Sequence, residues 1–223
     1  MPPRLLFPDP TTAADVLTFA RRAARVDDGA IRLRAAAGTL AMSAAALAPR
    51  GLLESVPTIL GMRFLPIDPE LACDLVVDAG ALGADADPHA VALPDSAVTA
   101  TWAGMSPPRT GWLQVGQVTT SVLAARAQWG IAAVAEALPA DPGGDVVRGI
   151  REVVWGPEDP AMGGLVTGAA FAAHAFGFLG DGETAAILRS GTWTRVTLRR
   201  GHVLIRAAGQ PSGLTSVRRT GAN

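Results

Sequence analysis

The residues best suited to chemistry lie in one short segment, WAGMSPPRTGWLQVG, at positions 102–116. Two consecutive prolines each fix a φ angle there, and a later glycine permits a φ angle that other residues avoid. Arg109 is therefore presented on a rigid corner between Trp102 and Trp112, which suits bidentate binding of a carboxylate or phosphate. We predict a ligand site made of these three residues and Ser106. The alternative is a structural corner in which Arg109 pairs with an acid and the tryptophans fill the core.

A second group of candidate residues is basic and lies near the end of the chain. In WTRVTLRRGHVLIR, alternation places Trp193, Arg195 and Arg199 on one side of a strand and Val196 on the other. We predict a basic surface, made of Arg195, Arg199, Arg200, His202 and Arg206. Three helices followed by a basic hairpin follow the order of a winged helix, but the helix before the hairpin has no arginine. Nucleic acid is therefore disfavoured as a partner.

Two catalytic or metal-binding patterns are weaker. The run Asp85, Asp87 and His89 could face a divalent ion, but HExxH, CxxC and EF-hand spacings are missing, so no metal is predicted. A hydrolase with an unconventional site around Ser106, Arg109 and an unassigned histidine stays an alternative, although the GxSxG elbow is absent. We leave open whether the chain is an enzyme and favour the reading that it is not.

Composition removes several enzyme classes. The 223-residue chain contains 19 arginines, no lysine and no tyrosine. It therefore has no lysine for a Walker A loop or a pyridoxal Schiff base, and no Tyr/Lys pair of a short-chain dehydrogenase. No cofactor is predicted. Charge is uneven, because seven acids and no arginine lie between residues 64 and 108, whereas seven arginines and no acid follow Glu183.

Hydrophobic periodicity predicts the elements that position these residues. A first helix capped by Thr11 or Thr12 precedes predicted strands at 30–35, 39–47, 58–67 and 71–79, with one or two short strands within 90–104. Helices are predicted at 114–138, 144–155 and 164–179, followed by a meander at 183–189, 193–200 and 202–207. The third of these helices is rich in small residues, which favours close packing against its neighbours or across a dimer axis.

The predicted fold class is α+β: a mostly antiparallel sheet with an N-terminal helix, a three-helix C-terminal half and a terminal β-meander. We predict one domain over 1–223, with a possible subdivision into 1–112 and 113–208 and a flexible tail at 209–223. A single cysteine and the lack of a long apolar run or secretory signal predict a cytoplasmic protein that does not cross a membrane.

Four segments carry a resemblance to other proteins: LPDSAVTATWAG, SPPRTGW, FGFLGDGE and WTRVTLRRGHVLIR. Together they resemble a group of uncharacterised proteins from high-GC actinobacteria, over most of the chain from about Ile59 onward. The resemblance implies no activity. It marks as positions of interest Trp102, Pro108, Arg109, Trp193, Arg195, Arg200 and His202.

These observations combine into one functional prediction. The chain is expected to be a non-catalytic cytoplasmic homodimer that binds an anionic small molecule or protein segment, with Arg109 as the anchor. The alternatives are the hydrolase and the nucleic-acid-binding wing described above.

Overall fold

The structure of the chain is a computed structural model that describes residues 3–51 and 54–208. The predicted flexible tail at 209–223 lies outside the described residues. The α-helices are α1 (Pro10–Ala23), α2 (Thr120–Ala137), α3 (Gly144–Trp155) and α4 (Gly168–Ala175). The strands are β1 (Arg4–Leu6), β2 (Ala30–Ala36), β3 (Thr39–Leu47), β4 (Thr58–Pro66), β5 (Cys73–Asp78), β6 (Gly83–Ala84), β7 (Ala90–Ala92), β8 (Leu113–Thr119), β9 (Glu158–Asp159), β10 (Leu165–Val166), β11 (Thr184–Ser190), β12 (Trp193–Leu198) and β13 (Gly201–Arg206).

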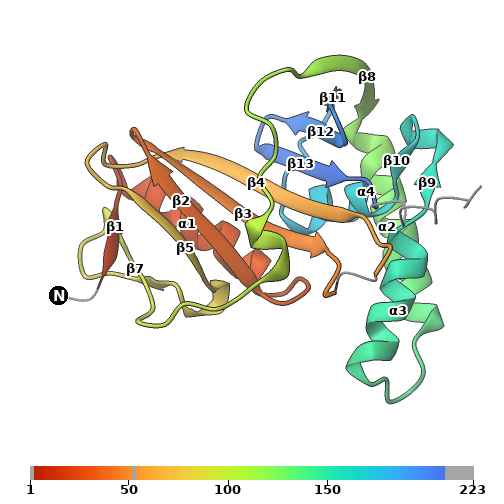
Figure 1. Cartoon of the computed structure of the whole chain (residues 1–223), viewed down its shortest axis with the longest axis horizontal. Helices are drawn as coiled ribbons and strands as arrows, with labels where there is room; N and C mark the ends of the chain where they lie inside the picture. Colours follow the sequence, from red (N-terminus) through yellow and green to blue (C-terminus); the bar gives the residue numbers. More distant parts are fainter. Residues whose placement is uncertain (1–2, 52–53, 209–223) are drawn as a thin grey trace, which may run out of the picture.

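One antiparallel sheet of eight strands organises the molecule, in the order β5-β2-β3-β4-β13-β12-β11-β8 (Figure 1). The first four strands in this order come from the N-terminal half of the chain and the last four from the C-terminal half. The halves meet where β4 pairs with β13, with Thr58 opposite Arg206 and Met62 opposite His202. Each half contains a helix followed by a three-strand meander. These are α1 with β2, β3 and β4, and α4 with β11, β12 and β13.

The first helix begins one turn earlier than the predicted caps. The side chain of Asp9 accepts hydrogen bonds from the backbone N–H of Thr12 (2.9 Å) and from its hydroxyl (2.8 Å), and Pro10 occupies the first turn. A proline fits there because its missing N–H has no partner inside the helix. The structure confirms the predicted apolar face, with Val16 and Phe19 buried against the sheet.

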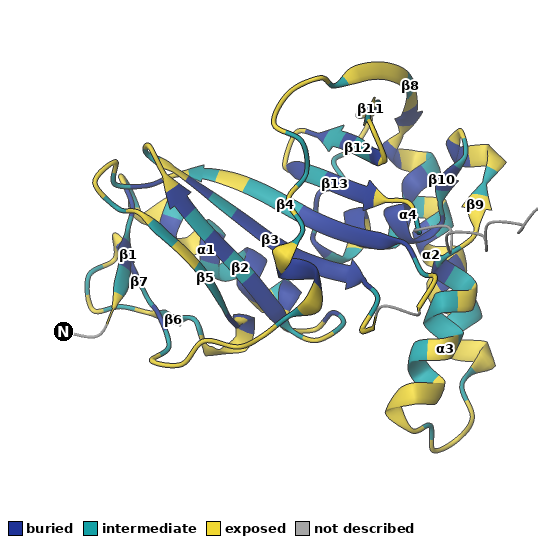
Figure 2. Cartoon of the chain, in the orientation of Figure 1, coloured by how far each residue is buried: buried dark blue, intermediate teal, exposed yellow. Residues whose placement is uncertain are grey.

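The helices cover one face of the sheet through an aromatic cluster. Phe19, Phe176 and Phe178 have ring centroids 5.4–6.0 Å apart. Strand β4 runs so close beneath them that a Cβ added at Gly61 would lie 2.1 Å from Phe176 Cδ2. Figure 2 shows the central strands as buried and the distal part of α3 as largely exposed. The core therefore lies between the sheet and helices α1 and α4.

The predicted fold class is wrong in its account of the C-terminal half. Residues 114–119, expected to begin a long helix, belong to the edge strand β8, and α2 begins only at Thr120. Helix α4 has eight residues instead of the sixteen expected. The C-terminal half is not a helical unit with strands appended: besides α2, α3 and α4 it contributes four strands to the same sheet, as many as the N-terminal half.

The expected dimer contact through the small-residue helix is also wrong. The small residues of α4 are buried inside the chain: Gly168, Ala169, Ala170, Ala172 and Ala173. They permit close approach of α4 to the sheet and to α2, so they are not available to a second molecule. None of the helices in the described ranges is both long enough and apolar enough to cross a bilayer.

Candidate functional site

The other face of the sheet is covered by a single connection, residues 93–112, which we call the strap. It links β7 to β8 and passes in front of the strands in Figure 1, whereas α1 lies behind them. Trp102, only 1% exposed, anchors it in a second apolar cluster with Leu60 and Leu204. The indole N–H of Trp102 donates to Asp28 Oδ2 at 3.1 Å. Trp102 is therefore a buried anchor and cannot contact a ligand, contrary to the prediction.

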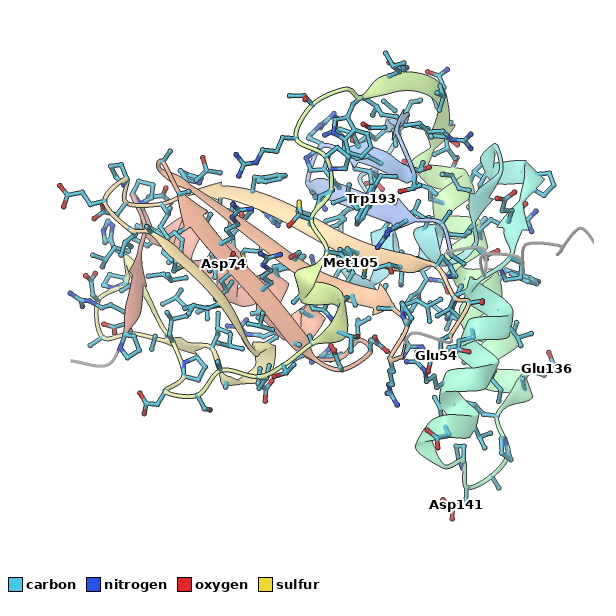
Figure 3. The ribbon with its side chains drawn as sticks, viewed as in Figure 1. Glu54, Asp74, Met105, Glu136, Asp141 and Trp193 are labelled. Carbon is cyan, nitrogen blue, oxygen red and sulfur yellow. The ribbon has the colours of Figure 1, made fainter. Side chains whose placement is uncertain are left out.

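Polar contacts fasten the strap just after Trp102, at Ala103 and Met105. Arg32 on β2 donates to both carboxylate oxygens of Asp74 (2.7 and 2.8 Å) and to the carbonyl oxygen of Ala103 (2.6 Å). Arg206 on β13 donates to the sulfur of Met105. Figure 3 shows Met105 where the strap crosses the sheet. These contacts hold the strap across strands from both halves.

A cleft of about 330 Å³ lies between the strap and the sheet. Its floor is apolar and comes from the middle strands, while the strap and the flanking strands contribute arginines. The lining residues are Arg32, Arg34, Ala41, Ser43, Leu60, Met62, Phe64, Met105, Ser106, Pro107, Pro108, Arg109, Trp112, Arg195, His202 and Leu204. We call this the strap cleft.

The strap cleft is positively charged, and none of the described residues that line it is an acid. Asp74 neutralises Arg32 and lies 4.0 Å from Arg34. Among the described residues, no carboxylate lies within 4.0 Å of the Arg109 or Arg195 guanidinium. Of the four arginines that line the cleft, Arg109 and Arg195 therefore have no acidic partner among the described residues.

Arg195 has an unusual environment for a charged group. Its guanidinium carbon lies 4.5 Å from the centroid of the Trp112 ring, a cation–π contact. Its Nε is buried and makes no hydrogen bond within the described part of the chain. Burial lowers the pKa of Arg195, because desolvation disfavours the charged form. Because no carboxylate of the described residues balances the charge of Arg195, the cleft favours a ligand that brings negative charge.

His202 faces the same cleft from β13. Its ring meets the Phe64 ring edge-on at 5.6 Å, and its Nδ1 lies 3.3 Å from Thr197 Oγ1. Burial, and to a smaller extent the charge of Arg195, lower the pKa of His202 below its usual value of 6.5. The neutral form of His202 is therefore favoured, which reduces its contribution to the predicted basic surface.

The structure brings together five of the predicted site residues and separates the others. Ser106, Arg109, Trp112, Arg195 and His202 all line the strap cleft. The remaining three basic residues of the predicted surface do not line it. Arg199 and Arg200 are exposed and form the turn between β12 and β13. Arg206 donates to the sulfur of Met105 on the strap.

Sequence reasoning missed the contribution of the N-terminal strands. Arg34 and Phe64 line the cleft from β2 and β4, and Phe64 is 48% exposed at its rim. The alternation in AIRLRA did place two arginines on one side of a strand. Nothing local indicated that this side would face a loop from more than 60 residues later, as the bond from Arg32 to Ala103 shows.

The hydrolase alternative finds no catalytic geometry. Within the described residues, Ser106 makes no hydrogen bond to a histidine. His174 is exposed on α4, a helix on the opposite face of the sheet. The only side-chain partner of His202 there is Thr197. Within residues 3–51 and 54–208, no hydrogen bond joins a nucleophile to a histidine.

The remaining sequence motifs are structural. Asp85 pairs with Arg4 at 3.6 Å, and Asp87 accepts the backbone N–H of His89 at 2.9 Å. The part of the chain that the structure describes has no group of three or more His, Cys, Asp or Glu residues arranged to hold a metal ion. The winged-helix alternative fails as well, because α4, which precedes the meander, is buried and presents no recognition helix.

Two family models match successive parts of the chain. Residues 1–104 match a domain of unknown function (DUF8010), and residues 107–210 match a second domain of unknown function (DUF8185). The predicted resemblance to uncharacterised proteins is therefore supported, whereas the two matches do not bear on an actinobacterial origin. No curated protein matches the chain.

Solved structures similar to this chain are DNA polymerase III beta subunits. A proposed beta subunit from Eubacterium rectale has a TM-score of 0.49 at 9% identity, over 93% of this chain and 65% of its own. The sliding clamp from Caulobacter crescentus has a TM-score of 0.45 at 13% identity, over 98% and 70%. The beta subunit from Thermotoga maritima has a TM-score of 0.43 at 9% identity, over 93% and 65%. The chain thus spans about two thirds of these proteins, and at these scores the likeness transfers no activity or partner.

The comparison corrects two predictions. The predicted small-molecule binder, with a hydrolase or winged helix as alternatives, finds no counterpart among these structures, which are DNA polymerase III beta subunits and sliding clamps. The predicted exclusion of nucleic acid as a partner finds no support among them either. The general description as an α+β protein of unknown function fits only in part.

Proposed function

We propose that the chain binds single-stranded nucleic acid in the strap cleft. The observation that carries the proposal is the unbalanced charge of the cleft: Arg109 and Arg195 have no carboxylate within 4.0 Å among the described residues, and no described lining residue is an acid. Phosphate groups supply the negative charge that these guanidinium groups lack.

The distribution of charge favours a chain of phosphates over a single anionic group. Arg34 comes from β2, Arg109 from the strap and Arg195 from β12, so positive charge borders the cleft from three separate elements. A nucleic-acid backbone presents repeated charges that such a groove can follow. Proteins that bind single strands without sequence preference combine a basic groove with exposed aromatic rings, and Phe64 at the rim provides one.

The shape of the cleft favours single strands over duplex. Reading a duplex requires a helix or ribbon that projects into a groove, and the strap cleft is concave. Its apolar floor, which includes Leu60, Met62 and Leu204, can receive an unstacked base. Bases of a duplex are stacked and paired, so they cannot enter without cost.

The direct test is a binding titration with a fluorescently labelled oligothymidylate, followed by anisotropy at low salt and at about 200 mM salt. The cleft variant is Arg109→Gln combined with Arg195→Met, and the matched control is Arg199→Gln combined with Arg200→Gln. Both remove two positive charges, but only the first pair lines the cleft. Thermal melts establish that each variant is folded.

We expect the cleft variant to bind about tenfold or more weakly than the parent, and its dependence on salt to become shallower by roughly 0.7 in log–log slope per lost phosphate contact. The control variant should bind within about twofold of the parent. Absence of binding by the parent, equal losses in both variants, or equal affinity for a duplex of the same length would each overturn the proposal.

Three further statements accompany this proposal. We propose that the chain acts in the cytoplasm, which agrees with the lack of a membrane-spanning helix in the described residues. The resemblance to proteins of high-GC actinobacteria is kept as a proposal that rests on the four quoted segments. We also propose that the chain is one structural domain, because both halves share one sheet.

A further inference from the structure

Strand β8 forms one outer edge of the eight-stranded sheet. Its sequence, LQVGQVT, contains no charged residue and no proline. Leu113 is 72% exposed and Val115 is 55% exposed, both unusually high for apolar strand residues. Among the described residues, β8 pairs with β11 on one side, and no strand pairs with its other side.

An edge of this kind is a template for another strand, because its outer N–H and C=O groups have no partner. Protein chains usually protect such edges with lysine, proline, a β-bulge or a covering segment, and β8 has neither of the two residue types. It carries one bulge, because the pairing with β11 shifts between Ile187 and Leu188 and leaves Val115 as an extra residue opposite them. Pairing with β11 is regular on both sides of this bulge, at 113–114 and at 116–119.

The opposite edge of the sheet, β5, is protected. The backbone N–H of Val98 on the strap donates to the carbonyl oxygen of Val76 at 2.8 Å, so the strap lies along the outside of β5. Strand β5 also carries Asp74 and Asp78, whose charges oppose strand addition. A head-to-tail pairing of β8 with β5 of another copy is thereby blocked. Of the two ends of the described sheet, β8 is the one available for strand pairing.

We propose that two copies of this chain pair through β8, antiparallel and about a two-fold axis, to form one continuous sheet. A single open edge that pairs with itself gives a closed dimer and no filament. Pairing β8 with its own copy sets no like charges opposite one another, because the strand is uncharged. The exposed side chains of Leu113 and Val115 lose water contact in the same step.

The test is sedimentation velocity over a concentration series of the full chain. The edge variant is Val115→Lys, and the control is Val153→Lys on α3, where the valine is 74% exposed and far from the sheet edge. Both variants gain one charge at an exposed valine. Thermal melts establish that both remain folded, and amide hydrogen exchange follows the β8 backbone.

We expect the parent and the control to form dimers, and the edge variant to dissociate with a dissociation constant at least about tenfold higher. In the parent, the β8 amides should exchange more slowly at high protein concentration than at low concentration. A parent that stays monomeric throughout the series, or an edge variant that dimerises as tightly as the control, would overturn the proposal. Oligonucleotide binding is measured separately, since neither valine lines the strap cleft.

Discussion

The two faces of the sheet are covered in different ways. Helices α1 and α4 pack on one face through Phe19, Phe176 and Phe178, with rings at contact distance and a glycine in β4 that admits them. The strap covers the other face as one irregular segment anchored by Trp102, and beside it lies the strap cleft. Regular elements with apolar faces close a surface, whereas a single crossing segment leaves room and brings polar groups. We therefore expect stability to reside mainly on the helix-covered face, and the ligand proposed above would bind on the strap-covered face.

The largest difference between the faces should appear on truncating a ring. Phe176→Ala removes a side chain that is 0% exposed, so the free energy of unfolding should fall by about 3–5 kcal/mol. Phe64→Ala, at the rim of the strap cleft, should cost less than about 1 kcal/mol, because Phe64 is 48% exposed. Urea unfolding monitored by circular dichroism measures both. Similar losses in the two variants would remove the proposed division between the faces.

A smaller effect is expected when the strap is released. Arg32→Gln removes the bonds to Asp74 and Ala103 and should lower stability by about 1 kcal/mol, since Asp74 is half exposed and solvent screens the pair. The strap amides should exchange faster, which hydrogen-exchange mass spectrometry measures. Arg34→Gln is the control, because its nearest carboxylate oxygen lies 4.0 Å away. Unchanged exchange in the strap would show that Arg32 does not hold it.

The strap-covered face should tolerate loss of the Arg195 guanidinium, whose Nε is buried. Arg195→Met keeps the length of the side chain and removes a guanidinium with an unsatisfied Nε, so the free energy of unfolding should change by less than about 1 kcal/mol. The same variant should bind oligothymidylate more weakly than the parent. Chemical unfolding and anisotropy on one preparation separate the two effects. A loss of stability as large as that of Phe176→Ala would make Arg195 a structural residue.

The smallest effect concerns pH. Burial lowers the pKa of His202 in the folded chain, so the unfolded chain takes up a proton more readily. The free energy of unfolding should therefore fall as pH drops below the unfolded value of about 6.5, and this dependence should be weaker in His202→Gln. Thermal melts of both proteins between about pH 7 and pH 5 measure the difference. Parallel curves would show that His202 titrates normally.

Local patterns predicted some parts of this molecule well. The meander was predicted with the correct faces, because Val196 points into the helix-side core and Arg195 into the cleft. The sequence also placed Ser106, Arg109 and Trp112 in one corner, and all three line the strap cleft, while their binding of a ligand stays a prediction. These successes share a cause, namely that periodicity and turn chemistry act over a few residues.

Long-range contacts explain the failures. Residues 114–119 were expected to form the start of a helix. Their pairing with β11 makes them part of a strand instead. Trp102 was expected at a ligand, but the second apolar cluster that buries it joins strands from both halves. The strap cleft joins Arg34 to His202, and nothing in either local pattern indicates that β4 and β13 are neighbours.

The pairing of β4 with β13 has a consequence for how the molecule could be assembled. Residues before the middle of the strap contain strands β1–β7, and residues after it contain β8–β13, so a cut after Gly104 divides no strand. The two pieces would still share the β4–β13 ladder and the contacts of α4 with β3 and β4. The strap then acts as a tether that fixes the local concentration of one half around the other. Two separately made halves should therefore reconstitute the sheet, with a yield that depends on their concentration.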